Sequence, residues 1–462
     1  MTTLKTISPV DSSIVVERRL ANNETITDAV TRALKAQGEW ARWEVEGRAS
    51  ALSRLVDAFV ARRDDIAVEL TWQMGRPIRY APGEIRGFEE RARTMIGLAP
   101  ESLADIDVGP KEGFRRFIRP TPLGVVLVIA PWNYPYLTAV NAVVPALMAG
   151  NAVLLKHAQQ TPLCAERFVE AGKEASLPEG LLQFLHMSHE ATAKLIKNPA
   201  IGHVCFTGSV RGGAAIQDAA SGRFISVGLE LGGKDPAYIR ADANLNHAIE
   251  NIVDGAFFNS GQSCCGIKRI YAHESLYDRF LEGAVALTRQ YVLDDPTKLT
   301  TTLGPMVRTS AADFVREQVR EAIAKGAKPL ISERDFIQSR PGTPYLAPQI
   351  LVGVDHSMRV MTEESFGPIV GIMKVPSDKE AIRLMNDSAF GLTSAIWTVD
   401  PEAAVSIGDQ LETGTVFMNR CDYLDPTLAW TGVKSSGRGA TLSRLGYEHL
   451  TRPKSYHLRV AV

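Results

Sequence analysis

The hydrophobic positions of the first hundred residues recur at helical spacing. Apolar side chains repeat every three or four residues over 26–43 and again over 48–72, which predicts one long helix in each range. Arg76-Pro77 and Pro82-Gly83 interrupt the repeat, because proline and glycine break regular structure. We therefore expect the N-terminal hundred residues to be helical.

From Phe114 onward, continuous runs of aliphatic and β-branched residues replace the helical repeat. Such runs are typical of parallel strands that helices cover on both faces. Helical stretches, for example 309–325, separate the runs, and this alternation predicts a doubly wound α/β fold. The expected strands lie at 124–131, 151–156, 180–186, 203–209, 235–239, 269–273, 393–398 and 414–419.

Two further extended segments lie apart from this alternation. The segment from Phe114 to Pro122 is partly polar, and the C-terminal stretch 455–462 has no helix after it. We expect the two to pair as an arm outside the main cores. Because an exposed strand edge usually acquires a partner, we expect a homodimer or a homotetramer.

Composition narrows the class of protein. A chain of 462 residues suggests two or three domains, and a net charge of -1 favours neither nucleic acid nor an anionic membrane as partner. The longest apolar runs are too short to cross a bilayer. The five cysteines are an odd number, and no apolar leader opens the chain, so we expect reduced thiols and a cytoplasmic location.

Four short clusters carry candidate chemistry: APWNYP at 130–135, GLELGGKDP at 228–236, FFNSGQSCCG at 257–266 and EESFGP at 363–368. A free cysteine is usually a small buried apolar residue, but a thiolate can also add to a carbonyl and form a labile thioester. Glu230 ends an apolar strand, which raises a carboxyl pKa and suits a general base; an ion pair with Lys234 is the alternative. Asn133 follows a buried strand, and its local sequence indicates a turn residue.

Together and in this order, the four clusters resemble the aldehyde dehydrogenase superfamily. The resemblance extends over nearly the whole chain and includes PLGVV, FTGS, NDSAFGL and GVKSSGRG. It implies an α/β fold with a Rossmann-type cofactor domain, an α/β catalytic domain and a β-strand oligomerisation arm. The expected cofactor domain is 1–103 with 123–231, on which 432–450 packs; the catalytic domain is 232–431, and the arm is 104–122 with 451–462.

The resemblance also implies roles for particular residues. Cys264, and not Cys265, is the expected nucleophile, and Glu230 is the base that activates water. The side chain of Asn133 and the backbone N–H of Cys264 are the expected oxyanion donors. The expected substrate pocket contains Tyr134, Ser263, Cys265 and Trp430.

The cofactor site departs from the usual dinucleotide fingerprint, because no G-x-G-x-x-G occurs in the chain. The resemblance nevertheless implies NAD or NADP on a variant Rossmann fold. Gln159 stands where the family usually has a ribose-binding Glu, which removes a charge that repels a 2′-phosphate and favours acceptance of NADP. The expected cofactor residues are Trp132, Lys156, Gln159, Phe206, Gly208, Ser209, Gly213, Leu231, Glu364 and Phe366.

The resemblance therefore implies NAD(P)-dependent oxidation of an aldehyde, with semialdehydes as a candidate class, to the acid through a thioester that water hydrolyses. Transfer of the acyl group to coenzyme A and a catalytically silent binding role are the alternatives. Arg420 is either the contact for a distal carboxylate or a surface arginine. We expect no metal site, because the His-Glu pairs at 189–190 and 273–274 lack the second His of a zinc motif.

Overall fold

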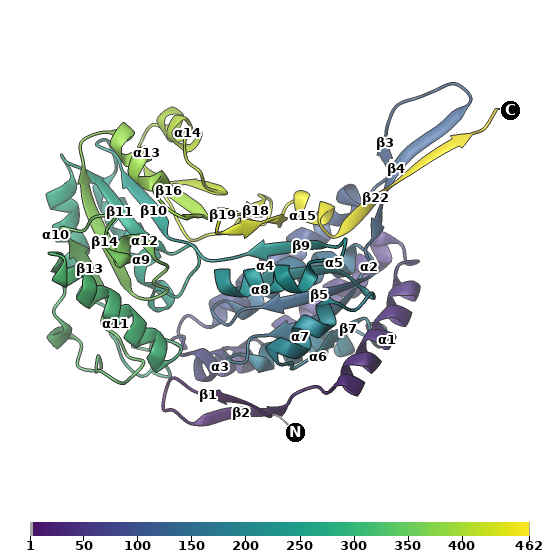
Figure 1. Ribbon diagram of the computed structural model, residues 1–462, viewed down its shortest axis with the longest axis horizontal. Coiled ribbons are helices and arrows are strands. Elements are labelled where there is room, and N and C mark those ends of the chain that lie inside the picture. The colour runs from purple at the N-terminus through teal and green to yellow at the C-terminus, as the bar shows by residue number, and fades with distance from the viewer. Residues whose placement is uncertain (1–2, 462) are drawn as a thin grey trace.

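The computed structural model describes residues 3–461; Met1, Thr2 and Val462, which lie at the ends of expected ranges, are outside the described residues. Figure 1 shows two α/β bodies side by side and a strand arm that projects from one of them. This arrangement confirms the expected fold class. Among the described residues, no helix is both long enough and apolar enough to cross a membrane.

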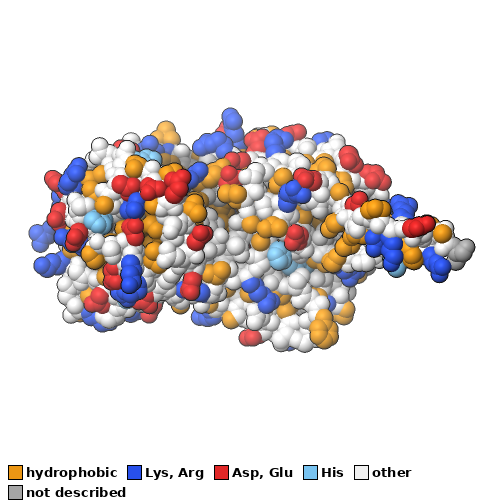
Figure 2. Space-filling view, turned by 90° about the horizontal axis from the view of Figure 1, so that it is seen from above, with side chains coloured by type: hydrophobic (Ala, Val, Ile, Leu, Met, Phe, Trp, Pro, Cys, Tyr) orange, Lys and Arg blue, Asp and Glu red, His pale blue; other side chains and the backbone are white. Residues whose placement is uncertain are grey.

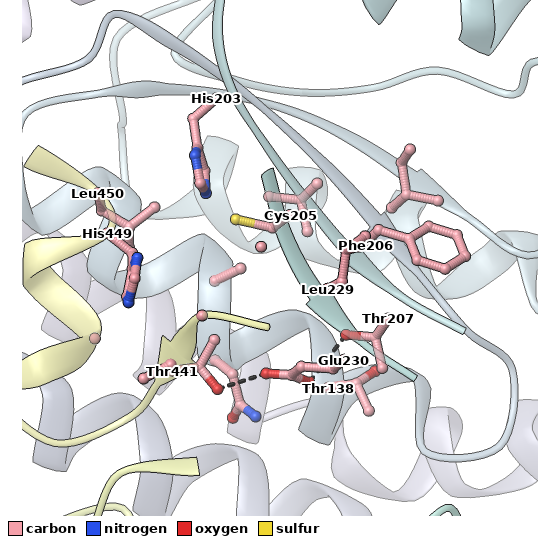
Figure 3. Close-up of a pocket in the computed structure, with 18 of the residues that line it drawn as sticks. Thr138, His203, Cys205, Phe206, Thr207, Leu229, Glu230, Thr441, His449 and Leu450 are labelled. Carbon is pink, nitrogen blue, oxygen red and sulfur yellow. Dashed lines mark hydrogen bonds between the residues drawn. The ribbon is translucent and has the colours of Figure 1, made fainter. Parts of the chain in front are cut away.

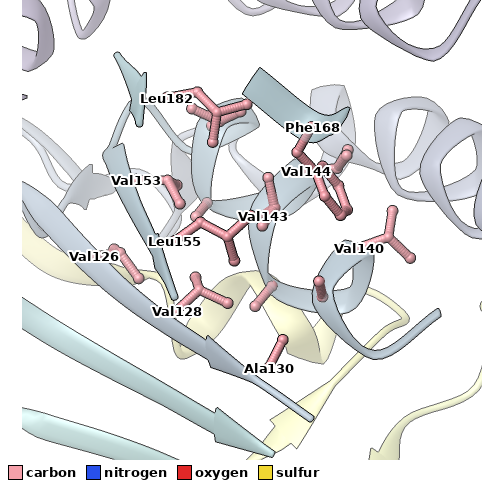
Figure 4. Packing of buried hydrophobic residues seen from close by; sticks show 14 of the residues in the cluster. Val126, Val128, Ala130, Val140, Val143, Val144, Val153, Leu155, Phe168 and Leu182 are labelled. Atoms are coloured by element: carbon pink, nitrogen blue, oxygen red, sulfur yellow. The ribbon is translucent and has the colours of Figure 1, made fainter. Parts of the chain in front are cut away.

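The first body is built on a six-stranded sheet with the order β20-β9-β8-β5-β6-β7. Its strands are parallel except β20, which pairs antiparallel with β9. Helices cover the sheet: in Figure 4 the valines of β5 and β6 face α5, and Phe168 of α6 lies next to Val144 of that helix. The elements are β5 (Val125–Ala130), α5 (Pro135–Met148), β6 (Ala152–His157), α6 (Pro162–Glu174), β7 (Leu182–Phe184), α7 (His189–Ile196), β8 (Ile201–Thr207), α8 (Val210–Ala220), β9 (Ser226–Glu230) and β20 (Gly437–Arg438).

The N-terminal helices pack on the same body, but two expectations for them are wrong. The range 48–72 forms two helices, because the chain leaves the helical conformation at Arg62, where φ is -99° and ψ is 12°. The guanidinium of Arg62 binds Glu170 and Glu174 of α6. A strand hairpin also precedes the helices, with alternating buried and exposed residues in its first strand. The elements are β1 (Thr3–Ile7), β2 (Ile14–Arg19), α1 (Asn23–Trp40), α2 (Val45–Val60), α3 (Arg63–Met74) and α4 (Pro82–Ser102).

The second body contains a seven-stranded sheet with the order β12-β13-β14-β11-β10-β16-β17. All of its pairs are parallel except that of β12 with β13. The elements are β10 (Asp235–Ile239), α9 (Leu245–Phe257), η1 (Phe258–Gly261), β11 (Ile267–His273), α10 (Tyr277–Thr288), α11 (Thr309–Ala324), β12 (Lys328–Pro329), η2 (Glu333–Asp335), β13 (Gln349–Val352), α12 (Arg359–Thr362), β14 (Ile369–Val375), α13 (Asp378–Asn386), β16 (Thr393–Trp397), α14 (Pro401–Gly408) and β17 (Thr415–Met418).

The arm is a three-stranded sheet with the order β22-β4-β3. β22 (Thr451–Arg459) pairs antiparallel with β4 (Phe114–Pro122) along its whole length, and β3 is Ile106–Asp107. The expected pairing of these two segments is confirmed. Lys and Arg side chains gather on the projecting arm in Figure 2.

Short strands connect the second body back to the first. β15 (Phe390–Gly391) pairs with β19 (Val433–Lys434), and β18 (Trp430–Thr431) pairs with β21 (Ala440–Thr441). The helix α15 (Leu445–Glu448) then leads into the arm. The strands thus fall into sheets as the two expected α/β parts require, whereas the residue numbers of the domain boundaries stay a prediction.

Candidate active site

A pocket at the carboxyl ends of β5 and β9 collects most of the expected chemistry. Glu230 is the last residue of β9, and Cys264 follows η1 in the second body. Both line the pocket, together with all four residues expected on the substrate side. Its other polar or charged lining residues are Arg76, Tyr80, Glu84, Arg91, Thr138, Asn141, Thr207, Asn251, Asp254 and Asp422.

The cysteine loop is held in an unusual backbone conformation. Asn259, Ser260 and Gly261 all have positive φ, with values of 54°, 56° and 66°. A side chain at Gly261 would collide with the carbonyl oxygen of Gly367, 2.2 Å from its Cβ position. Gly233 likewise has no room for a Cβ, because the carbonyl oxygen of Cys264 would lie 2.2 Å away. The glycines of three clusters therefore allow the backbones around Cys264 to approach closely.

Asn133 lies against this loop. It follows β5, and its Nδ2 donates a hydrogen bond to the carbonyl oxygen of Gln262 at 3.2 Å. The side chain is buried, with 4% of its surface exposed. The structure thus brings the amide expected at the oxyanion to within two residues of Cys264.

Glu230 is held between two threonine hydroxyls from different parts of the chain. Thr207 Oγ1 donates to Oε2 at 3.0 Å, and Thr441 Oγ1 donates to Oε1, as Figure 3 shows. Burial raises the pKa of Glu230, as expected, although the two hydroxyls oppose that shift. The alternative ion pair does not form, since Lys234 Nζ donates to Ser365 Oγ at 2.7 Å instead.

Cys265 occupies a different environment from its neighbour. Its thiol donates to Oδ1 of Asp422 at 2.9 Å, and Ser263 Oγ donates to the same oxygen at 3.1 Å. Contact with Cys264 and burial raise the pKa of the Cys265 thiol well above its usual range. Asp422 is a site residue that the sequence analysis missed, and burial raises its pKa too.

Three side chains that line the pocket have hydrogen-bond donors without an acceptor among the described residues. Arg91 donates through Nη1 to the Leu137 carbonyl at 2.7 Å and to Asn141 Oδ1 at 3.3 Å, and its Nε and Nη2 bind no described residue. The Asn141 Nδ2 and the Tyr134 hydroxyl are buried without a partner among the described residues. Sequence analysis did not single out Arg91 or Asn141, although a signal was present: each is a polar residue on an apolar helix face.

The arginine that was considered for a distal carboxylate lies elsewhere. The guanidinium of Arg420 stacks on the ring of Tyr423 at 4.0 Å, and Arg420 is not among the residues that line the pocket. The surface alternative is therefore correct for Arg420. Trp430 is 4% exposed and lines the pocket through its place in β18.

The residues expected at the pyrophosphate surround the beginning of α8. Ser209 caps this helix, accepting from the N–H of Gly212 at 3.1 Å. A Cβ at Gly208 would lie 2.7 Å from the ring of Phe206, and one at Gly213 would lie 2.6 Å from Leu231. The helix therefore begins directly against the ends of β8 and β9, where its N–H groups favour an anion.

The remaining cofactor residues form two groups. Glu364 Oε1 accepts from the N–H of Gly233 at 3.1 Å, and the rings of Trp132 and Phe366 meet edge to face at 5.6 Å. Lys156 is buried, and its Nζ donates only to the His157 carbonyl at 3.3 Å; burial lowers the pKa of Lys156 to about 8. A buried amine with so few partners suits the hydroxyls of a nucleotide ribose, so these residues fit the expected cofactor.

Gln159 lies in the turn after β6. Its carbonyl oxygen accepts from Thr6 Oγ1 of β1 at 2.8 Å, while its side chain makes no hydrogen bond with a described residue. The amide is thus free to meet a ligand. Within residues 3–461, no group of three His, Cys, Asp or Glu side chains is placed to hold a metal ion.

Comparisons with known proteins identify the family of the chain. The model of the aldehyde dehydrogenase family matches residues 1–456. The chain is 34% identical to the 3,6-anhydro-alpha-L-galactose dehydrogenase of Streptomyces coelicolor, covering 100% of this chain and 94% of the relative. It is 33% identical to the succinate semialdehyde dehydrogenase [NAD(P)+] Sad of Escherichia coli, covering 92% and 91%.

Solved structures give the same result. The succinic semialdehyde dehydrogenase of Streptococcus pyogenes, in complex with NADP+, superposes with a TM-score of 0.94 at 29% identity, covering 99% of this chain and 100% of that one. Gox0499 superposes with a TM-score of 0.95 at 32% identity, with the same coverage. The chain belongs to the aldehyde dehydrogenase family and is an NAD(P)+-dependent aldehyde dehydrogenase.

Proposed function

We propose that this enzyme oxidises an aldehyde to the free acid, with Cys264 as nucleophile and Glu230 as the base that activates water. The observation that carries the proposal is that both residues line one pocket while neither forms an ion pair with a described residue. Glu230 thus remains available as a proton acceptor, and a base with a raised pKa takes a proton readily near neutral pH.

The Cys264 thiol first loses its proton to Glu230 or to solvent water, and the resulting thiolate sulfur adds to the aldehyde carbonyl. A C–S bond forms, and the carbonyl oxygen gains the negative charge. The Asn133 amide and the N–H of Cys264 stabilise that charge; this N–H binds no backbone carbonyl of the described residues. Removal of one such donor typically costs about 3 kcal/mol of barrier.

When bound, the nicotinamide supplies the acceptor for the hydride, and a thioester on Cys264 results. Glu230 then takes a proton from water, whose oxygen adds to the thioester carbon. The C–S bond breaks, the acid leaves, and Cys264 is restored. The two threonine hydroxyls keep the Glu230 carboxylate oriented between turnovers.

Two alternatives predict other products. Transfer to coenzyme A would need no base for water, and a silent family member would form no reduced cofactor. Absorbance of reduced nicotinamide, with an aldehyde present and coenzyme A left out, separates both from the proposal. Cys264→Ala should abolish the signal, and Cys265→Ala should keep most of it; the reverse result would make Cys265 the nucleophile.

For the cofactor, we infer that NADP is accepted appreciably and that NAD is still used. The free side chain of Gln159 supports this inference, because an amide can donate to a ribose hydroxyl or to a 2′-phosphate. The buried Lys156 adds a second donor at the end of the same strand.

For the substrate, we infer a semialdehyde that carries a carboxylate. The support is the set of unfilled donors on Arg91, Asn141 and Tyr134, which face no acceptor among the described residues. Arg91 is 8% exposed and forms no ion pair there, and a buried guanidinium is costly without an anionic partner. The relatives named as succinate semialdehyde dehydrogenases agree with this class.

We further propose that the arm joins copies of the chain into a homodimer or homotetramer. It exposes Ile106, Leu458 and Val460, at 55%, 43% and 65% of their surfaces, although an isolated arm has no core to support it.

The five cysteines are all free, which supports a location in the reducing cytoplasm.

A further inference from the structure

We propose that Arg76 and Glu84 are positioning residues, which hold Asn133 against the cysteine loop during oxidation. The proposal rests on the oxyanion role proposed for Asn133. Arg76 follows α3 and Glu84 lies in the first turn of α4, so neither belongs to the clusters that carry the catalytic residues.

The two residues form an ion pair inside the protein. Arg76 Nη1 binds Glu84 Oε2, and only 3% and 1% of the two residues are exposed. Two charges removed from water are stable only when further hydrogen bonds satisfy their remaining atoms. The partners of those atoms therefore show what the pair does.

Each partner belongs to the backbone or side chains around Asn133. Arg76 Nη2 donates to the carbonyl oxygen of Asn133, and Nε donates to Asn259 Oδ1 at 3.3 Å. Glu84 Oε1 accepts from the N–H groups of Tyr136 and Leu137, at 2.9 and 3.0 Å, in the first turn of α5. The ion pair thus binds both the backbone of Asn133 and the first turn of α5.

The same contacts extend to the loop of the nucleophile. Asn259 Nδ2 donates to the Asn133 carbonyl at 3.3 Å and to the Gln262 carbonyl at 3.4 Å. Asn133 Nδ2 also donates to the Gln262 carbonyl. The resulting ring of hydrogen bonds joins the end of β5 in the first body to η1 in the second, and it fixes the distance between the amide and Cys264.

Each nitrogen of Arg76 is engaged within the protein, so only two of its five N–H hydrogens lack an acceptor among the described residues. Its guanidinium lies over the ring of Tyr134 at 4.6 Å. Arg91, in the same pocket, differs because two of its nitrogens bind no described residue. Arg76 therefore acts through Asn133, and its effect should appear in the rate of oxidation.

A double-mutant cycle tests this coupling. Arg76→Lys keeps the charge beside Glu84, but a single ammonium cannot reach both Asn133 and Asn259. We expect the rate of the first hydride transfer to fall at least tenfold, with the KM values for aldehyde and cofactor changed less than twofold. In the Asn133→Ala background, the same substitution should change the rate less than twofold. Arg93→Lys, an exposed ion-paired arginine on α4, is the control and should leave the rate unchanged.

The outcomes separate the inference from the function on which it rests. Equal losses from Arg76→Lys in both backgrounds would overturn the positioning role while leaving the oxyanion role of Asn133 intact. Full activity of Asn133→Ala would overturn the oxyanion role itself, and the inference with it. Should Arg76→Lys fail to fold, Glu84→Gln, which keeps an oxygen for the two N–H groups, completes the same cycle with the same criteria.

Discussion

Thr441 donates its hydroxyl hydrogen to Oε1 of Glu230, although 211 positions separate the two residues in the chain. The bond favours the charged carboxylate and so opposes the rise in the pKa of Glu230 that burial causes. Thr441→Val should therefore raise that pKa further. A general base acts only when deprotonated, so the acid limb of the kcat profile should move to higher pH.

A hydrogen bond to a charged group contributes about 2 kcal/mol, which corresponds to roughly 1.5 pH units. The measurement is kcat against pH for wild type, Thr441→Val and Thr441→Ser, the last of which keeps the donor and should match wild type. Thr427→Val removes an exposed hydroxyl that binds Asp425 and is the control. Superimposable profiles for wild type and Thr441→Val would refute this role.

The Glu230→Gln variant should separate the two chemical steps. The glutamine cannot take a proton from water, so hydrolysis of the thioester slows more than hydride transfer. Stopped-flow absorbance should show a burst of reduced nicotinamide followed by slow turnover. A slow first turnover without a burst would instead assign Glu230 chiefly to activation of the thiol.

Cofactor preference should follow the residue at position 159. A carboxylate there would face the 2′-phosphate of NADP, and two like charges a few ångströms apart cost about one kcal/mol or more. Gln159→Glu should therefore shift the ratio of kcat/KM towards NAD by roughly tenfold, equivalent to about 1.4 kcal/mol. The neighbouring control is Gln160→Glu. Gln160 lies in the same turn as Gln159, and its amide binds the backbone carbonyls of Ile7 and Gln73. An unchanged ratio in Gln159→Glu would place the ribose elsewhere.

Substrate choice should depend on Arg91. Arg91→Gln removes the charge but keeps a donor, and a lost charge-assisted hydrogen bond costs about 2 kcal/mol. With succinate semialdehyde as substrate, KM should rise at least tenfold, while with butanal, which lacks the carboxylate, it should change less than twofold. Butanal also reports whether the variant folds. Arg420→Gln is the surface control, and equal effects on both aldehydes would exclude a carboxylate contact at Arg91.

Association should depend on the arm. Light scattering at micromolar concentration should show a mass that is a multiple of 50.4 kDa. Leu458→Glu with Val460→Glu should lower it, because charges replace apolar side chains that are exposed on the free arm. Val405→Glu, at a position on α14 that is 63% exposed, should not. A wild-type enzyme of 50.4 kDa would contradict the proposal.

Local sequence predicts those parts of the molecule whose structure depends on neighbouring residues. The strands around Val125–Ala130 and Ala152–His157 are apolar throughout most of their length, so their pattern alone indicates burial on both faces. Glu230 was expected at a strand end with a raised pKa because its neighbours are leucine and glycine, and the structure agrees. Cys264 lies in a loop whose glycines and positive φ angles reflect its own motif.

Residues that act through distant partners could not be found in this way. Arg91 and Arg93 share one helix, and the helical repeat places Arg91 between Phe88 and Met95 on the apolar face, but the repeat does not reveal the pocket that Arg91 meets there. The expected continuous helix was also wrong: it breaks between α2 and α3, where Arg62 binds glutamates of α6, which are distant in the sequence. Asp422 and Thr441 likewise acquire their meaning only from the thiol and the carboxylate that they meet across the fold.

The return of 437–441 to the first body has a consequence for biosynthesis. β20 completes the sheet beside β9, and Thr441 then meets Glu230, so these positions join a body whose other strands were made much earlier. Nascent domains begin to fold as they leave the ribosome. While this segment is still inside the ribosomal tunnel, the emerged chain already contains Cys264 and Glu230. It still lacks β20 and the Thr441 hydroxyl, which contact β9 and Glu230 in the folded protein. Competence for turnover should therefore arise only after the segment that holds β20 has left the tunnel and paired with β9.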